Sequence, residues 1–189
     1  LAKAPRSIAD QYLDNQAKPL KAWLRRPAYR DAIRQEITGG IHAAPDIVIA
    51  HSMGSLIAID LIAHMSRDDA PALLVTLGSP LSMPSVWEKL PVKLQEWTAT
   101  RSTNWANLYD RRDIATFSEP LPSRRFPRVM NVRVRNVRPD HNERSHSARR
   151  YLSHAFLVPL VLGYASGAGP VAEVQAGKID ALDGTHRIG

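Results

Sequence analysis

The chain has 189 residues, a length that suits one domain, and 44% of its residues are apolar, which is ordinary for a globular protein. It contains no cysteine, so disulfide bonds, thiolate metal sites and a cysteine nucleophile are excluded. The formal net charge of +7 favours acidic surfaces or ligands, and no apolar run in the sequence reaches the length of a membrane span.

Residues 1–40 have a helical pattern. Ser7 is placed to cap a first helix, and Pro27 fits the first turn of a second helix. The glycine pair at 39–40 predicts that this second helix ends in a left-handed cap.

The segment 46–65 has the pattern around which the other elements are organised. Its short apolar run, 47–50, predicts a strand that is buried on both faces. Ser52 follows at a sharp turn, and the apolar run 56–65 then predicts a buried helix. We expect Gly54 to be required because strand and helix approach closely there and a Cβ would clash.

Further strands are expected along the rest of the chain. Residues 72–77 and 103–109 have the apolar composition of buried strands, whereas 129–137 alternates apolar and charged residues as a half-exposed edge strand does. Between the first two of these, residues 81–101 predict short helices over the site, which would form a candidate lid or a wall of the substrate pocket that includes Trp87.

The end of the chain predicts one more helix, from Ala148 to Tyr164, with a kink at Pro159. Beyond Ser166 the composition becomes rich in glycine and alanine, and we expect residues 166–189 to form a loosely held tail. Alternating strands and helices of this kind predict an α/β fold with a mostly parallel sheet flanked by helices, formed by residues 1–165.

A serine between a buried strand and a helix has the geometry of a nucleophile elbow. The turn exposes the Ser52 hydroxyl to a base, and the helix N-terminus brings partial positive charge and free N–H groups close to it. The N–H of Met53 would then be one donor to a developing oxyanion.

At these residues the chain resembles the α/β-hydrolase family of lipases and esterases. The segment Ala50-His51-Ser52-Met53-Gly54 matches the family's G-x-S-x-G elbow, with Ala50 in place of the first glycine. The resemblance covers residues 30–163. It implies a serine hydrolase whose nucleophile is followed along the chain by an Asp or Glu and then by a His.

The resemblance implies Asp113 as the acid of this set. It follows the third strand by a few residues, at the carboxyl end where such folds build their sites. The segment 105–113 resembles the acid-bearing loop of lipase-like hydrolases, in which the later Asp is usually the triad member. Asp110 is the alternative, and its other role would be to cap the turn through its side chain.

The base is expected in the loop after the last strand. His146 precedes a helix and is followed by Tyr151 and Leu152, as the catalytic His of the family commonly precedes such a pair. His141 is the second candidate. His154 is expected within the helix as a packed or surface residue, and His51, beside the nucleophile, is expected to be structural or to line the pocket.

The implied reaction is the hydrolysis of an ester-type bond (a carboxylic ester, a lipid or a thioester) through an acyl-enzyme on Ser52. It needs no metal and no organic cofactor. The tryptophans in 81–101 favour a small-molecule or lipid substrate with an apolar acyl or alcohol group.

The pattern departs from the family on the N-terminal side. The family's sheet has further strands before the nucleophile strand, whereas residues 1–45 read as helix here, and the family's His-Gly oxyanion loop is absent. The strand 47–50 would therefore have a bare apolar edge, which is an aggregation hazard. We expect a preceding segment or an additional chain to complete the sheet.

A binding module is the alternative function. The arginine-rich region 124–150 could bind anionic partners on a hydrolase fold that has lost its activity. Few aromatic residues interleave with these arginines, which disfavours nucleic acid. The sequence leaves the location of the protein open, with the cytoplasm favoured.

Overall fold

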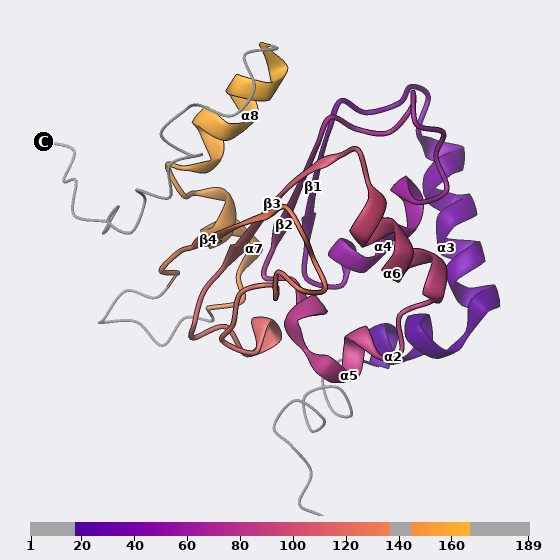
Figure 1. The fold of residues 1–189 in the computed structure, drawn as a ribbon, viewed down its shortest axis with the longest axis horizontal. Coiled ribbons are helices and arrows are strands. Elements are labelled where there is room, and N and C mark those ends of the chain that lie inside the picture. The colour runs from indigo at the N-terminus through magenta and orange to yellow at the C-terminus, as the bar shows by residue number, and fades with distance from the viewer. Residues whose placement is uncertain (1–17, 137–144, 167–189) are drawn as a thin grey trace, which may run out of the picture.

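The computed structural model describes residues 18–136 and 145–166. Within these residues the protein is an α/β fold built on a four-stranded, all-parallel sheet, as the sequence predicts (Figure 1). The strands pair in chain order, and they are β1 (Ile47–His51), β2 (Leu73–Leu77), β3 (Asn104–Tyr109) and β4 (Val129–Arg133).

The two central strands are buried as expected. All five residues of β2 are buried, and β3 is buried along most of its length. On the outer strand β4 the predicted alternation is confirmed, because Val132 is buried, Arg133 is exposed and Val134, just beyond the strand, is buried again.

The prediction that β1 is buried on both faces is wrong. Only Ala50 of this strand is buried, and Ile49 is 42% exposed. The reason is that, among the described residues, β1 pairs with β2 alone and its other edge has no neighbouring strand. The sequence shows the apolar character of β1, but not how much of that apolar surface the surrounding elements cover.

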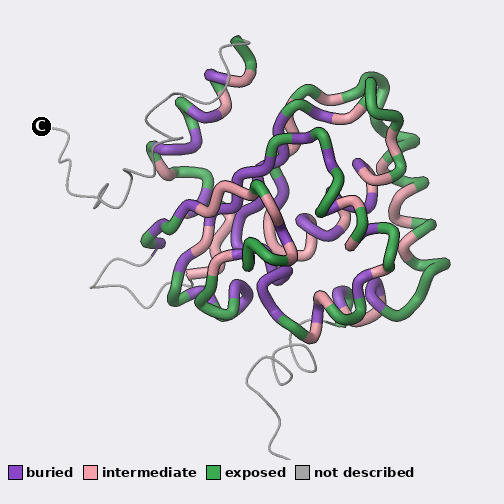
Figure 2. The backbone as a smooth tube through the Cα atoms, viewed as in Figure 1, coloured by how far each residue is buried: buried purple, intermediate pink, exposed green. Residues whose placement is uncertain are grey.

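Five helices lie on one side of the sheet and share a core with it (Figure 1). This core contains Trp23, Leu56, Leu74 and Trp105. The helices are α2 (Lys18–Arg25), α3 (Pro27–Gly40), α4 (Gly54–Ile62), α5 (Pro84–Trp87) and α6 (Val92–Thr100). The outer side of α3 is largely exposed, as Figure 2 shows, and α3 has no buried residue.

A second core lies on the opposite face, where α7 (Ala148–Leu152) and α8 (Leu157–Ala165) pack on the sheet. The prediction of one helix kinked at Pro159 is wrong, because the chain leaves helical structure at 153–156 and resumes it at Leu157. Pro159 then falls in the first turn of α8, where its missing N–H would have no intrahelical partner in any case.

The helices that precede the sheet begin as expected but end differently. Pro27 opens α3 at its first position, as the sequence predicts. The predicted left-handed cap is wrong, since neither Gly39 nor Gly40 has a positive φ and the N–H of Ile41 closes the helix on the carbonyl of Thr38 at 3.3 Å. The helix expected after Ser7 and the tail beyond 166 lie outside the described residues.

The carboxyl ends of the four parallel strands meet at one edge of the sheet, and their loops converge there. Two short 3-10 helices belong to these loops, η1 (Pro80–Ser82) after β2 and η2 (Ile114–Thr116) after β3. The hydroxyl of Ser82 donates to the carbonyl of Thr116, which ties the two loops together. Across residues 18–136 and 145–166, no helix is both long enough and apolar enough to cross a bilayer.

Candidate active site

Ser52 lies directly after β1 in a left-handed backbone conformation, with φ at 56°. Such a φ is uncommon for a residue other than glycine and costs conformational energy, so the surrounding structure must hold it. The N–H of Ser52 donates to Leu77 of β2 at 2.9 Å, and its carbonyl accepts from Ser55 at the start of α4 at 3.0 Å. The strand therefore turns into the helix within two residues, with Ser52 at the turn.

Three side chains from distant parts of the chain form a continuous hydrogen-bonded row. The Oγ of Ser52 lies 2.8 Å from Nε2 of His146, and Nδ1 of the same imidazole lies 2.9 Å from Oδ2 of Asp113. A carboxylate can only accept, so Nδ1 carries the proton and Nε2 is free to accept from the serine hydroxyl. This is the tautomer that a general base needs.

Asp113 is fully buried, with 0% exposure, and its carboxylate is held at both oxygens. Oδ1 accepts from the N–H of Ala115 at 2.9 Å, because Asp113 caps the N-terminus of η2. Oδ2 accepts from His146 and also from the hydroxyl of Tyr151, which lies at 2.7 Å. These hydrogen bonds compensate for the burial of a charged group.

Asp110, the alternative acid, contacts different partners. Its carboxylate accepts from the backbone N–H groups of Arg112 and Asn136, so it joins the end of β3 to the chain beyond β4. The geometry therefore brings Asp113 and not Asp110 into contact with His146. The turn-capping role expected of Asp110 matches its bond to Arg112.

The other candidate bases are placed apart from this row or are not described. His141 lies outside the described residues. His154 lies between α7 and α8 and not within a helix, and its Nε2 is 2.9 Å from Oδ1 of Asn136. Burial lowers the pKa of His154, and the charge of Asp110 opposes that shift.

His51 is in contact with His146. The two imidazole rings have centroids 4.6 Å apart, and the ring of Tyr151 is 6.0 Å from that of His51. Burial lowers the pKa of His51, and so does the charge that His146 can carry, while a hydrogen bond to the backbone of His146 and the charge of Asp113 oppose the shift. The surroundings of His51 therefore favour its neutral form, and its ring packs against that of His146.

The glycine that the site requires is Gly78, and the expectation for Gly54 is wrong. A Cβ on Gly54 would meet nothing within 4 Å. A Cβ on Gly78 would lie 2.8 Å from Oδ2 of Asp113 and 3.2 Å from Nδ1 of His146, and Gly78 has a φ of +56°. The close approach is therefore between the residue that follows β2 and the Asp113–His146 pair, a contact between segments far apart in the sequence.

Met53, the expected oxyanion donor, stands at the N-terminus of α4 directly after the serine. Its carbonyl accepts from Leu56 and Ile57, whereas no backbone acceptor in the described part of the chain takes its N–H. That N–H is thus available to an incoming oxygen atom.

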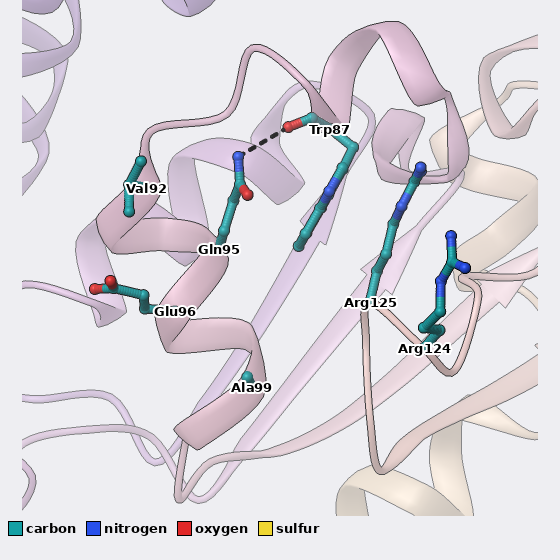
Figure 3. A pocket seen from close by; sticks show the side chains of 7 residues that line it. All are labelled: Trp87, Val92, Gln95, Glu96, Ala99, Arg124 and Arg125. Atoms are coloured by element: carbon teal, nitrogen blue, oxygen red, sulfur yellow. Dashed lines mark hydrogen bonds between the residues drawn. The ribbon is translucent and has the colours of Figure 1, made fainter.

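Trp87, expected in the substrate pocket, lines a groove of about 570 Å³ (Figure 3). The ring of Trp87 packs edge-on against Phe126 at 4.9 Å, and the guanidinium of Arg125 lies 5.7 Å from it. The groove is lined by Trp87, Val92, Gln95, Glu96, Ala99, Arg124 and Arg125. Ser52, His51 and His146 are not among these residues, so a pocket shared by His51 and Trp87 remains a prediction.

The sequence reasoning used Tyr151 only as part of the pair that follows His146, and it missed the contacts of the Tyr151 hydroxyl. Its hydroxyl bridges the two acids of this region, since it donates to Asp113 and accepts from the N–H of Asp110 at 3.1 Å. Its spacing of five residues from His146 places the tyrosine in the short helix α7 that follows this histidine. Within the described residues no group of three or more His, Asp or Glu side chains could hold a metal ion.

The fold and these contacts define an α/β protein with a parallel sheet and a Ser–His–Asp row at the carboxyl ends of its strands. Comparison with protein-family models, with curated proteins and with solved structures gave no match. The function is therefore argued from the site itself.

Proposed function

We propose that this protein is a serine hydrolase of the esterase or lipase type, with Ser52 as nucleophile, His146 as general base and Asp113 as the acid that orients it. The observation that carries the proposal is the unbroken hydrogen-bonded row Ser52–His146–Asp113, in which each atom has the donor or acceptor role that the reaction needs. The strained φ of Ser52 supports it, because strain of this kind clusters at functional residues.

The reaction would proceed by acyl transfer. Nε2 of His146 takes the proton of Ser52 while Oγ bonds to the carbonyl carbon of the substrate, and the oxyanion that forms accepts from the N–H of Met53. The bond to the leaving alcohol or thiol then breaks, and His146 gives its proton to that group. Water then attacks the acyl-enzyme and passes a proton to His146, the bond between Oγ and the acyl carbon breaks to release the carboxylic acid, and His146 returns the proton to Oγ of Ser52. The proposed substrate is an ester or thioester with an apolar group.

Labelling with a fluorophosphonate probe, followed by peptide mapping, tests this function. We expect the label on Ser52, with no labelling of the S52A or H146A variants. Ser55→Ala is the matched serine control, because Ser55 is buried and its hydroxyl has no partner among the described residues. The exposed His42→Ala is the histidine control. A folded wild-type protein that takes no label would contradict the proposal.

We also propose that a further strand pairs with β1, supplied by a segment of a longer chain or by an additional chain. The support is the free edge of β1 within the described residues and the exposed Ile49 on that strand. An apolar strand with free backbone donors and acceptors is otherwise a template for aggregation. Such a strand would also carry loops to the same edge of the sheet, where a second oxyanion donor would come from.

An anion-binding module without activity is the second candidate. Its support is the pair Arg124 and Arg125 beside the groove of Figure 3. Salt-dependent binding of a polyanion to a folded protein that takes no label on Ser52 would favour this function over hydrolysis.

A further inference from the structure

The hydroxyl of Tyr151 has its proton direction fixed by its two partners. The N–H of Asp110 can only donate, so at 3.1 Å it occupies a lone pair of the hydroxyl. The hydroxyl proton must then point to its other neighbour, Oδ2 of Asp113 at 2.7 Å. The tyrosine is 0% exposed, so no solvent competes for this proton.

The same oxygen is the partner of the base. Oδ2 of Asp113 lies 2.9 Å from Nδ1 of His146, so one carboxylate oxygen accepts from both the imidazole and the phenol. Oδ1 is occupied by the N–H of Ala115. A carboxylate held at both oxygens cannot rotate away from the base, and the charge that it offers the imidazole is divided between two donors.

We propose that Tyr151 is a positioning residue that acts through Asp113: it fixes Oδ2 against His146 and limits the negative charge that the acid presents to the imidazole. Only the expected effect of Tyr151 on the reactivity of Ser52 rests on the proposed function. The physical claim, that the phenol and the imidazole of His146 share Oδ2 of Asp113, stands on the contacts alone.

Two features of the surroundings fit this role. Gly78 leaves the space in which the three groups meet, since a Cβ there would lie 3.0 Å from Cε2 of Tyr151 as well as close to the acid and the base. Burial, with the nearby charge of Asp113, raises the pKa of Tyr151 well above its ordinary value, so the phenol remains a donor throughout the usable pH range.

The polar and aromatic groups that contact the imidazole or its carboxylate partner come from separate segments of the chain. His51 is the last residue of β1 and Ser52 lies in the turn that follows it. Asp113 comes from the loop after β3, and Tyr151 from α7. Asp110 does not contact the imidazole, and its backbone N–H donates a hydrogen bond to the Tyr151 hydroxyl. Asp113 is therefore the only carboxylate among the described residues in hydrogen-bond contact with His146, and Tyr151 is the group that shares it.

The test is the titration of the His146 imidazole by NMR in the whole chain, comparing the wild type with Tyr151→Phe. Without the phenol, Oδ2 offers its full charge to the imidazolium, so the titration midpoint of His146 should move to higher pH by about half a unit to one unit. A midpoint that stays in place or moves to lower pH would overturn the proposal. Tyr164→Phe is the control, because Tyr164 packs against the same core without contacting Asp113.

A second variant covers the case in which Tyr151→Phe does not fold. Site-specific 3-fluorotyrosine at position 151 keeps the ring and the hydroxyl but makes the phenol a stronger donor. The midpoint should then move to lower pH, opposite to the phenylalanine variant. An unchanged midpoint in a folded fluorotyrosine protein would also overturn the proposal.

The rate of fluorophosphonate labelling of Ser52 gives the catalytic readout. In Tyr151→Phe we expect a fall of roughly tenfold at the pH plateau, and an acid limb that moves with the His146 midpoint. In an Asp113→Ala background, Tyr151→Phe should not change the labelling rate, because the carboxylate through which Tyr151 acts on His146 is absent. Absence of labelling in the wild type would contradict the proposed function, whereas the NMR titration would still decide the role of Tyr151.

Discussion

Asp110 and Asp113 show how neighbouring residues of one type acquire different roles. Both are buried at the carboxyl end of β3, but backbone N–H groups occupy the carboxylate of Asp110, while Asp113 contacts the imidazole of His146. The two acids therefore differ in what their loss should change, the fold in one case and the chemistry in the other.

Asp113→Asn should lower the rate of Ser52 labelling by about 10³–10⁴-fold, because an amide in place of the carboxylate no longer favours the Nδ1–H tautomer of His146. Asp110→Asn should instead lower the free energy of unfolding by about 1–3 kcal/mol, because a buried carboxylate that accepts two N–H groups is replaced. Labelling kinetics and chemical denaturation of both variants provide the check. Equal labelling rates for the two variants would contradict the assignment of the acid.

Gly78→Ala should reduce both stability and labelling. The added Cβ would lie 2.8 Å from Oδ2 of Asp113, and the φ of +56° costs a residue with a Cβ about 1–2 kcal/mol. Gly54→Ala is the matched control, because its Cβ would meet nothing within 4 Å and its φ is not positive. Similar losses in both variants would mean that the site does not depend on the space at Gly78.

At the scale of the elements, local patterns in the sequence predict the strands and the elbow well. Apolar runs mark β1, β2 and β3, and alternation marks β4, because burial follows strand periodicity. The wrong predictions concern features that depend on contacts between segments far apart in the sequence. The requirement for Gly78 depends on Asp113 and Tyr151, and the burial of β1 depends on which elements cover it, and no local pattern reveals either.

The exposed edge of β1 leads to a prediction about association. Ile49→Lys should suppress concentration-dependent association of the 189-residue chain, because a charged side chain on an edge strand opposes pairing with another strand. Size-exclusion chromatography over a range of concentrations is the measurement. The exposed Val92→Lys on α6 is the control, since a helix offers no free strand edge. A wild-type chain that stays monomeric throughout would count against a missing neighbour of β1.

For the molecule as a whole, two histidines make stability depend on pH. The pKa values of His51 and His154 are both lowered from 6.5 in the folded protein, chiefly by burial. The unfolded chain therefore binds these protons at higher pH than the folded protein does. The free energy of unfolding is therefore highest at pH values above the histidine pKa of the unfolded chain, where both rings are neutral. It decreases as the pH falls below that pKa.

Chemical denaturation at about pH 7.5 and about pH 5.5 should show a lower free energy of unfolding at the acidic pH. His51→Gln and His154→Gln should each reduce that difference, because each removes one buried group that must take up a proton. The exposed His42→Gln should leave it unchanged. A difference that is the same in all four proteins would mean that other groups cause it.

The order of the strands also bears on how the site comes into being during synthesis. Each strand pairs with the one made just before it, so the sheet can grow by addition as the chain leaves the ribosome. Ser52 and Asp113 are in place once β3 has formed, whereas His146 and Tyr151 belong to the segment that packs on the opposite face after all four strands exist. In a nascent chain, Ser52 would therefore lack its contact with His146 until that last segment has packed on the sheet.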